Sequence, residues 1–463
     1  MPAILSPIDG KPAFTFTQLD AAAALERVAA AEAAQRAWRQ TSIAERSALL
    51  LRMLDRYADN ADANAEAITR MMGKPLAQAK GEFAGGFSQR TRHLCAVAEH
   101  ALRDLEIDQG DGIRRTIRRD PVGVVLNIAA WNYPLLVPIN LIAAAILAGD
   151  AVLLKHAEQT ALVADQLARA FTEAGAPEGL FTALHVDHAV AAQVIDSRRL
   201  GYVAFTGSVR GGREVYRQVA QRNFIGVGLE LGGKDPAVVL EGAPAAKVAA
   251  HLVDGAFYNA GQSCCAVERI YVHRSLYAEF VEAYVAAVHD YVVGDPLDPA
   301  TTLGPLVNGA AAQRIRDQAA EALAKGARKL SDDGRFTVPD TSDCYVAPQV
   351  FDNVDHSMAV MREESFGPII GIMPFDSDDE AVALANDSQF GLTASVWTED
   401  AARGAAIAER LDAGTVFQNR CDYLDPALAW TGIKDSGHGA SLSELGFHAV
   451  TRPKSYHLRG VIP

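Results

Sequence analysis

The sequence predicts an α/β protein built around doubly wound parallel sheets, and three observations support that class. From residue 121 onward, short apolar runs alternate with segments of helical periodicity. Strands separated by helices of this length favour a parallel sheet with helices on both faces. The same alternation of strands and helices starts again near residue 232. A chain of 463 residues is long enough for about three domains or lobes. We therefore expect two α/β units, each binding ligands at the carboxyl ends of its strands.

The first hundred residues are expected to be mainly helical. Segments 21–39 and 42–60 carry alanine or larger apolar residues at helical spacing, and Gly and Pro break the pattern within 73–75. Another helix is expected over about 78–100. The polar and basic segment 108–119 then predicts an extended arm that leaves the domain.

The two α/β series assign the remaining elements in order. In the first, strands are expected at 122–128, 151–155, 182–186 and 202–207, and helices at 135–147, 160–173 and 189–196. In the second, strands are expected at 236–240, 268–273, 345–351, 367–375 and 394–398, and helices at 245–259, 275–291, 308–325 and 379–386. A last strand-like piece covers 454–459 in a polar tail.

The charge balance argues against a nucleic-acid partner. Asp and Glu total 57, Lys and Arg total 43, and the formal net charge is −14. Non-specific binding to nucleic acid depends on an excess of Lys and Arg. The local run of Arg114, Arg115, Arg118 and Arg119 is interpreted as one face of a strand or arm.

No membrane span and no targeting segment are expected. The most apolar stretch, 135–154, is interrupted by Pro138, Asn140, Gly149 and Asp150, so it predicts a buried helix followed by a buried strand. The N-terminal residues lack the basic and apolar regions of a signal peptide.

The cysteines indicate a reducing compartment. Cys95, Cys264, Cys265, Cys344 and Cys421 are too few and too scattered for a disulfide framework, and no Cys or His spacing suits zinc. We therefore expect a cytoplasmic protein that holds no metal ion.

One cysteine pair is a candidate nucleophile. The segment FYNAGQSCCA places Cys264 and Cys265 at the end of a helix, beside small residues that let another molecule approach the backbone. A thiolate is a strong nucleophile once its pKa is lowered. A pair of buried structural cysteines is the alternative, and the segment alone does not decide between the two.

Two further polar residues stand at predicted strand ends. Glu230 is isolated among Leu and Gly in GLELGGK, where desolvation would raise its pKa and suit a general base; a solvated edge position is the alternative. Asn132 in IAAWNYP is placed to donate its amide to an oxyanion, or to cap the helix that begins near Pro134.

A further signal concerns phosphate binding. The fingerprint GxGxxG is absent from the first strand–helix turn, but FTGS at 205–208 precedes Gly211, Gly212 and a helix. Backbone N–H groups at such a helix start can bind a phosphate.

Taken together, these segments resemble the aldehyde dehydrogenase superfamily over nearly the whole chain. The matching motifs, in order, are PVGVVLNIAAWNYP, LLKHAEQT, FTGSVRGG, LELGGK, NAGQSCCA, EESFGP and GIKDSGHG. The resemblance implies a Rossmann-type nucleotide-binding domain in 1–101 and 121–231 and an α/β catalytic domain in 232–449. Segments 102–120 and 450–463 would form a small β oligomerisation arm and tail.

The resemblance also implies the site residues. Cys264 matches the nucleophile, Glu230 the general base, and Asn132 the oxyanion donor beside the backbone N–H of Cys264. Cys265 is then a neighbour without a required role. The cofactor-binding positions implied are Trp131, Lys155, Glu158, Gly207, Ser208, Leu231, Glu364 and Phe366.

Among these positions, Lys155 matches the lysine that meets the adenosine ribose, and Gly207 with Ser208 matches the turn near the pyrophosphate. Glu364 and Phe366 match the pair that holds the nicotinamide ribose and ring. NAD is the expected cofactor and NADP is disfavoured, because Glu158 would repel a 2′-phosphate.

The activity implied is oxidation of an aldehyde to the acid through a thiohemiacetal and a thioester, in the hydrolytic branch that does not acylate CoA. A semialdehyde or another small to medium aldehyde is the expected substrate, and a homodimer or homotetramer the expected assembly. The alternatives are a CoA-acylating semialdehyde dehydrogenase, a thiol hydrolase that uses no nicotinamide, and a catalytically silent binding relative.

Several positions depart from the commoner family pattern. Lys155 is followed by His156 and Ala157 where Pro and Ser are usual, and Val267 and Glu268 stand where many members carry Gly and Ser. Asn140 replaces a common tunnel tryptophan, while Trp430 occupies an aromatic tunnel position.

Two charged residues near the expected tunnel mouth, Arg420 and Asp422, allow either a polar substrate or a solvated surface pair. The surface pair is the interpretation that we favour from the sequence.

Overall fold

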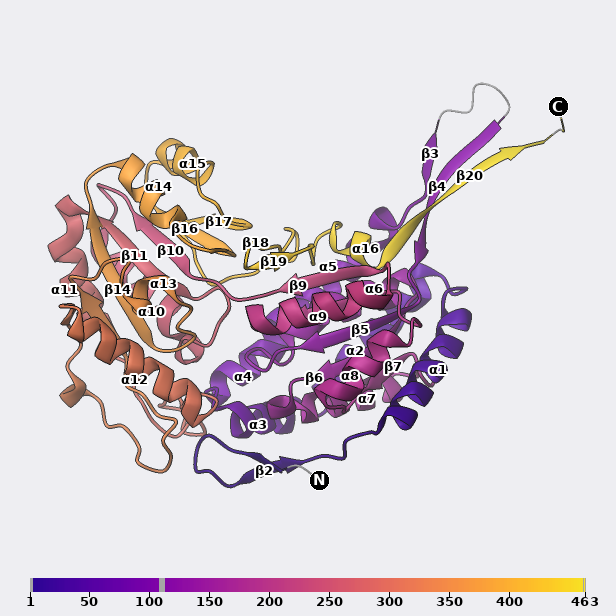
Figure 1. Ribbon diagram of the computed structural model, residues 1–463, viewed down its shortest axis with the longest axis horizontal. Coiled ribbons are helices and arrows are strands. Elements are labelled where there is room, and N and C mark those ends of the chain that lie inside the picture. Colours follow the sequence, from indigo (N-terminus) through magenta and orange to yellow (C-terminus); the bar gives the residue numbers. More distant parts are fainter. Residues whose placement is uncertain (1–2, 108–112, 461, 463) are drawn as a thin grey trace.

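The computed structural model describes residues 3–107, 113–460 and 462. Figure 1 shows two α/β lobes and an arm of strands that projects away from them. The α/β class with parallel sheets is therefore confirmed. Part of the predicted arm, 108–112, and residues 1–2, 461 and 463 lie outside the described residues.

The first lobe contains a six-stranded sheet in the order β19-β9-β8-β5-β6-β7. Its strands run parallel except for β19, which pairs antiparallel with β9 and brings residues of the 232–449 segment into this sheet. The strands are β5 (Val124–Ala129), β6 (Ala151–His156), β7 (Phe181–Ala183), β8 (Tyr202–Thr206), β9 (Gly226–Glu230) and β19 (Gly437–His438).

Helices cover both faces of the first sheet, as Figure 1 shows. They are α1 (Ala21–Trp38), α2 (Ile43–Ala58), α3 (Ala61–Met72), α4 (Leu76–Glu82), α5 (Ser88–Ala101), α6 (Leu136–Ala148), α7 (Leu162–Glu173), α8 (His188–Asp196) and α9 (Val209–Arg222). Side chains that cap helix N-termini define several starts, such as the Ser42 and Glu45 capping box of α2.

The centre of this lobe is α6 with its neighbouring strand β6. Residues 138–148 of α6 and all six residues of β6 are buried. A helix that is apolar on every side belongs in a core, and strands buried on both faces are typical of parallel sheets. The predicted buried helix and buried strand are therefore confirmed.

The second lobe contains a seven-stranded sheet in the order β12-β13-β14-β11-β10-β16-β17, parallel except for β12. Its strands are β10 (Asp235–Val239), β11 (Val267–His273), β12 (Arg328–Lys329), β13 (Gln349–Asp352), β14 (Ile369–Phe375), β16 (Thr393–Trp397) and β17 (Thr415–Gln418). Its helices are α10 (Ala245–Phe257), α11 (Tyr277–Val288), α12 (Gly309–Ala324), α13 (Ala359–Arg362), α14 (Asp378–Asn386) and α15 (Ala401–Ala408).

The projecting arm is a three-stranded antiparallel sheet in the order β20-β4-β3. Its strands are β3 (Leu105–Ile107), β4 (Ile113–Pro121) and β20 (Thr451–Arg459), and the short helix α16 (Gly446–Ala449) leads into β20. The arginine run lies on β4, where Arg114 and Arg118 approach Glu106 and Asp104 at 3.6 and 3.7 Å. Two small pairs complete the fold: β1 (Ala3–Leu5) with β2 (Pro12–Thr15), and β15 (Phe390–Gly391) with β18 (Ile433–Lys434).

The helix expected over 78–100 is interrupted. A π-helical turn, Phe83–Phe87, separates α4 from α5. A Cβ atom on Gly86 would lie 2.7 Å from the Leu136 side chain, so the glycine permits the close approach of α6. Helix α3 was not predicted, and its buried face mixes the polar Asn64 and Thr69 with apolar residues.

Within the described ranges, no helix combines the length and the hydropathy that a bilayer crossing requires. Nor does this part of the chain hold three or more His, Cys, Asp or Glu side chains grouped as metal ligands.

Candidate functional site

The predicted site residues of the first lobe gather at one edge of its sheet. Strand β5 pairs in parallel with β6 and β8, and Ile128 stands opposite both Lys155 and Phe205. The segments that follow these three strands therefore leave the sheet at the same edge. Glu230 ends β9 at this edge, opposite Thr206.

A cavity of about 400 Å³ opens between the two lobes near this edge. Cys264, Glu230 and Leu231 line it together. Other lining residues come from α5, α6 and the C-terminal segment: Gln89, Arg90, Leu136, Val137, Asn140, Asp422, Tyr423, Trp430, His438 and Ser441. The structure thus brings the expected nucleophile and the expected base into one cavity.

The backbone before Cys264 makes a sharp turn. Helix α10 ends at Phe257, and Asn259, Ala260 and Gly261 all have left-handed φ values, between 52° and 70°. A Cβ atom on Gly261 would lie 2.4 Å from the carbonyl oxygen of Gly367, so only glycine fits there. The Gln262 side chain fixes the turn: its Oε1 accepts the N–H of Val307 at 2.8 Å, and its Nε2 donates to the Asn259 carbonyl at 3.2 Å.

The two cysteines have different surroundings. Cys264 is partly exposed, whereas Cys265 is buried and donates its thiol to Asp422 Oδ1 at 3.1 Å. The hydrogen bond with Cys264 and burial raise the pKa of Cys265 well above its usual range. Cys265 is therefore held as a thiol, and Cys264 is the better placed of the two to react.

Burial shields the carboxyl group of Glu230 from water and changes its pKa. Ser441 Oγ donates to Glu230 Oε1 at 3.2 Å, while Oε2 is buried and has no hydrogen-bond partner among the described residues. Burial raises the pKa of Glu230 to about 8. A carboxyl group that titrates near neutrality can take a proton from water.

Asn132 lies against the nucleophile loop and does not line the cavity wall. It is buried, its Nδ2 donates to the Gln262 carbonyl at 3.2 Å, and its own carbonyl accepts from Asn259 Nδ2 at 3.2 Å. One amide proton remains without an assigned acceptor. Helix α6 begins at Leu136 without a side-chain cap, so the capping alternative for Asn132 is wrong.

His156, which stands where the family usually has proline, connects the loop after β6 to the turn that carries Asn132. Its Nε2 lies 3.0 Å from the Pro134 carbonyl and its Nδ1 lies 3.0 Å from Thr160 Oγ1. Burial lowers the pKa of His156 to about 4, so the ring is neutral at pH 7. The ring then donates to Pro134 and accepts from Thr160, which fixes the loop after β6 to the turn that carries Asn132.

Lys155 and Glu158 stand together at the end of β6. Burial lowers the pKa of Lys155, and the Glu158 carboxylate opposes that shift. Glu158 is exposed at the start of a short 3₁₀ turn, where Gln18 Nε2 donates to it at 3.3 Å. A cationic and an anionic group therefore stand side by side at this end of the edge.

Gly207 and Ser208 form the turn into α9. The Gly207 N–H donates to the Glu230 carbonyl at 3.0 Å, and Ser208 Oγ accepts from the Gly211 N–H at 3.2 Å. Among the described residues, the N–H groups of Val209 and Arg210 donate to no capping side chain, which leaves the helix start able to bind an anion. This turn and the Lys155 loop lie on the edge beside the cavity and do not line it.

Two predicted residues meet at the loop that follows α13. The Trp131 and Phe366 rings contact edge to face, with centroids 5.5 Å apart, and Phe366 has a left-handed φ of 51°. Glu364 Oε1 accepts the Gly233 N–H at 3.0 Å, and burial raises the pKa of Glu364 to about 7. Leu231 packs against the backbone of α9, because a Cβ on Gly212 would lie 2.6 Å from its side chain.

A buried ion pair that sequence reasoning did not assign holds this loop. Lys234 Nζ lies 2.7 Å from Glu268 Oε2, and Glu268 also accepts the N–H groups of Ser365 and Phe366. From the sequence, Glu268 is only a departure from the family pattern. Its carboxylate links the turn before β10 to the Glu364–Phe366 segment.

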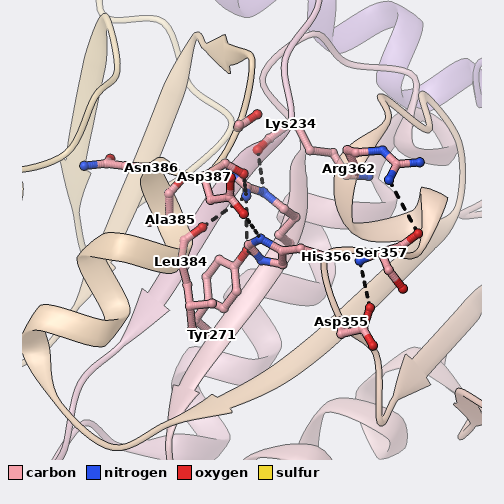
Figure 2. A network of polar contacts seen from close by, with 12 residues as sticks. Lys234, Tyr271, Asp355, His356, Ser357, Arg362, Leu384, Ala385, Asn386 and Asp387 are labelled. Carbon is pink, nitrogen blue, oxygen red and sulfur yellow. Dashed lines mark hydrogen bonds and ion pairs between the residues drawn. The ribbon is translucent and has the colours of Figure 1, made fainter.

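Arg269 forms hydrogen bonds that join the Lys234 turn to other elements of the second lobe. Figure 2 shows the surrounding network of polar contacts. Its Nε donates to the Lys234 carbonyl at 2.9 Å, and its Nη2 donates to the Ala385 carbonyl at the C-terminus of α14 at 2.9 Å. Tyr271 Oη lies 2.8 Å from His356 Nε2, and His356 Nδ1 lies 2.6 Å from Asp387. A cation at a helix C-terminus is favourable, so Arg269 fixes α14 and the Lys234 turn together.

Two further buried cations lie near the cavity, and sequence reasoning missed both. Lys74 Nζ pairs with Glu82 Oε2 at 2.6 Å beneath the Tyr133 ring, and Glu82 Oε1 accepts the N–H groups of Leu135 and Leu136. Arg90 lines the cavity from α5. The chain positions of these residues give no signal, because their partners come from distant segments.

The predicted surface pair of Arg420 and Asp422 is wrong. Arg420 is exposed and stacks on Tyr423, with Cζ 3.4 Å from the ring centroid. Asp422 turns toward the cavity instead, where it accepts from Ser263 Oγ at 2.7 Å and from Cys265. Burial raises the pKa of Asp422.

Comparisons with known proteins show what the chain is similar to. The family model described as Aldehyde dehydrogenase family matches residues 2–456. An aldehyde dehydrogenase of Paenarthrobacter nicotinovorans is 36% identical over 459 residues, covering 98% of both chains. A succinate-semialdehyde dehydrogenase [NADP(+)] of Deinococcus radiodurans is 36% identical over 460 residues, covering 98% of this chain and 94% of that one. The solved structure of an NAD-dependent aldehyde dehydrogenase from Sinorhizobium meliloti superposes with a TM-score of 0.95 at 32% identity, covering 100% of this chain and 92% of that one.

Proposed function

Since the chain belongs to the aldehyde dehydrogenase family, we propose that it oxidises an aldehyde to the carboxylic acid with NAD, through a thioester on Cys264 that water hydrolyses. The observation that carries this proposal is the shared cavity, in which a partly exposed thiol and a buried, unpartnered carboxylate oxygen face the same space. A semialdehyde or another small to medium aldehyde is the substrate.

The edge of the first sheet suits a nicotinamide dinucleotide. The open N–H groups at the start of α9 fit a phosphate, and Lys155 and Glu158 fit a ribose. Leu231 lines the cavity, and the contact of Trp131 with Phe366 and the hydrogen bond of Glu364 with Gly233 support these residues as the nicotinamide end of the site. When bound, the nicotinamide ring supplies the acceptor for the hydride of the substrate.

The residues of the chain supply the remaining chemistry. Cys264 Sγ attacks the carbonyl carbon, and the oxygen gains a negative charge that Asn132 Nδ2 and the Cys264 N–H stabilise. After oxidation, the carbonyl of the thioester occupies the same position. Glu230 then takes a proton from water, the hydroxide attacks the thioester carbon, and the acid leaves as the Cys264 thiolate is restored.

Absorbance at 340 nm, with aldehyde and NAD in the presence and absence of CoA, tests this proposal. NADH formation without CoA, with the free acid as product, is the expected outcome. A requirement for CoA would instead favour the acylating activity. Ester hydrolysis without NADH formation, or no turnover at all, would favour a thiol hydrolase or a silent relative.

We expect NAD to be preferred over NADP by about tenfold or more. Glu158 would face the adenosine ribose and repel the 2′-phosphate of NADP. Two like charges about 4 Å apart repel by about 1 kcal/mol in water and by more at a partly dry site. Ratios of kcat/KM for the two cofactors measure the preference, and Glu158→Ser should reduce it. A wild-type enzyme that prefers NADP would show that Glu158 does not face the ribose.

We expect a homodimer or homotetramer in solution. In the projecting arm, β4 pairs with β20 through nine residues. Among the described residues, β3 pairs with three residues of β4, and β20 is an edge strand of this sheet. An exposed edge strand is an aggregation hazard that a second subunit can cover. Light scattering at micromolar concentration should give two or four times 49.4 kDa. A particle with the mass of one chain would contradict this prediction.

We also propose a cytoplasmic location. All five cysteines are free thiols in the structure, which fits a reducing compartment.

A further inference from the structure

The turn that carries Asn132 is held by a carboxylate from a different helix. Helix α6 begins at Leu136, and the residue before it, Leu135, has no side chain that could cap the helix. Glu82, the last residue of α4, supplies the cap: its Oε1 accepts the N–H of Leu135 at 2.8 Å and that of Leu136 at 3.1 Å. A carboxylate at this place satisfies N–H groups that a helix start leaves without partners, and its charge is favourable there.

Lys74 fixes the other oxygen of Glu82. Its Nζ lies 2.6 Å from Glu82 Oε2, and the two side chains are 0% and 1% exposed. The same ammonium group lies 4.0 Å from the ring centroid of Tyr133, the residue after Asn132. Although Glu82 lines the cavity, both of its oxygens already accept from buried groups, so its carboxylate is engaged by the protein and not by a substrate.

The position of Glu82 is transmitted to Asn132 through a short and constrained segment. Only two residues separate Asn132 from Leu135, and one of them, Pro134, has a restricted φ. The Pro134 carbonyl accepts from His156 at 3.0 Å, and the Asn132 carbonyl accepts from Asn259 at 3.2 Å. A shift of the backbone at Leu135 therefore moves Asn132 as well. Misplacement of a catalytic group by about 1 Å can slow a reaction by about 10²-fold.

We propose that Glu82, held by Lys74, is a positioning residue for Asn132. It fixes the turn before α6 so that the Asn132 amide and the Cys264 N–H point to the same substrate oxygen. This assignment rests on the proposed aldehyde oxidation and adds to it the group that sets the geometry of the oxyanion donors.

A structural role of the ion pair is the alternative, because removing one partner of any buried pair destabilises a fold. The two roles predict different results. A structural role lowers stability and activity whether or not Asn132 is present. A positioning role lowers turnover only while Asn132 is there to be positioned.

Two double variants without buried charge provide the test. Lys74→Met/Glu82→Leu removes the acceptor for the Leu135 and Leu136 N–H groups, whereas Lys74→Met/Glu82→Gln keeps an amide oxygen at the same place. Replacing both partners leaves no unpaired ion in the core. We expect the leucine variant to lose about 10- to 100-fold in kcat/KM, mainly through kcat, and the glutamine variant to keep most of the wild-type value.

The same two variants are then measured in an Asn132→Ala background by single-turnover kinetics, in which slow rates remain readable. We expect their difference to shrink to less than about twofold, because both act through Asn132. Alkylation of Cys264 by iodoacetamide forms no oxyanion and should have the same rate in both. Equal kcat/KM in the two variants would overturn the proposal, as would a difference that persists without Asn132.

A shorter carboxylate and a distant cap complete the comparison. Glu82→Asp still offsets the charge of Lys74 but withdraws from Leu135 and Leu136, so it replaces the leucine variant if that chain does not fold. Asp20→Ala removes a carboxylate cap from α1, where Asp20 Oδ1 accepts the Ala23 N–H at 2.8 Å, and should leave kcat/KM unchanged. A similar loss in Asp20→Ala would attribute the effect to general weakening of the lobe and would overturn the proposal.

Hydrolysis of p-nitrophenyl acetate separates this proposal from the proposed function. Attack of Cys264 on the ester forms an oxyanion at the same donors without NAD. A leucine-to-glutamine difference on the ester, in an enzyme that oxidises no aldehyde, would support the positioning role and contradict the proposed function. Aldehyde oxidation that is equal in the two variants would overturn the positioning role and leave the proposed function standing. A wild type that turns over neither substrate would overturn both.

Discussion

Replacing Cys264 by alanine is expected to lower dehydrogenase turnover by at least about 10³-fold while leaving NAD binding largely unchanged. The thiol forms the covalent bond on which both half-reactions depend, so no other residue can compensate for its loss. The residues expected to meet NAD lie along the sheet edge, and none of them contacts the Cys264 side chain through a hydrogen bond. Steady-state NADH formation and NAD titration by fluorescence measure the two effects.

Cys265→Ala is the matched control, because the neighbouring thiol is buried and donates to Asp422. This variant should keep most of the activity. Trapping the acyl-enzyme and locating the modified residue by mass spectrometry gives an independent assignment. A label on Cys265, or a Cys264→Ala enzyme that still turns over, would show that the wrong thiol has been chosen.

Glu230→Gln is expected to slow thioester hydrolysis by about 10²- to 10⁴-fold, the range for loss of a general base, and to affect hydride transfer much less. Rapid mixing should therefore show a burst of NADH followed by a slow steady state. The buried carboxyl of Glu230 has a pKa near 8, and only its ionised form accepts a proton from water. Hydrolysis in the wild type should therefore rise with pH through about 8, and this rise should be absent from the variant.

The isosteric amide keeps the contact with Ser441 and the buried volume, so the comparison isolates the proton acceptor. A variant with normal steady-state turnover would remove Glu230 from the role of base. The same conclusion would follow if the variant retained the wild-type pH profile.

The sequence predicted the alternation of strands and helices because burial in parallel sheets leaves a strong apolar pattern, as in β6 and α6. The motifs around Glu230 and Cys264 were equally visible, since each combines a reactive residue with small neighbours. Their placement in one cavity depends on two sheets that meet, which a linear pattern does not describe.

Other features left no readable signal. Arg90 resembles any polar residue on an amphipathic helix, and only the approach of α6 gives it Asn140 as a partner. Asp422 looked like a surface residue because it stands two positions from the oppositely charged Arg420. Its contacts with Ser263 and Cys265 span more than 150 residues of chain. The π-helical turn before α5 likewise contains Gly86, whose lack of a side chain matters only because Leu136, from a distant segment, lies against it.

The left-handed turn before Cys264 has a consequence for redesign of the enzyme. Asn259 and Ala260 adopt a backbone conformation that costs non-glycine residues about 1–2 kcal/mol each, and Gly261 has no room for a side chain. Few residue types can occupy these positions, so a mutant library spread over the turn would consist mainly of inactive clones. The cavity walls formed by Asn140 and Trp430 belong to other segments with ordinary backbone, and a library confined to them can vary the accepted aldehyde while the reactive thiol keeps its position.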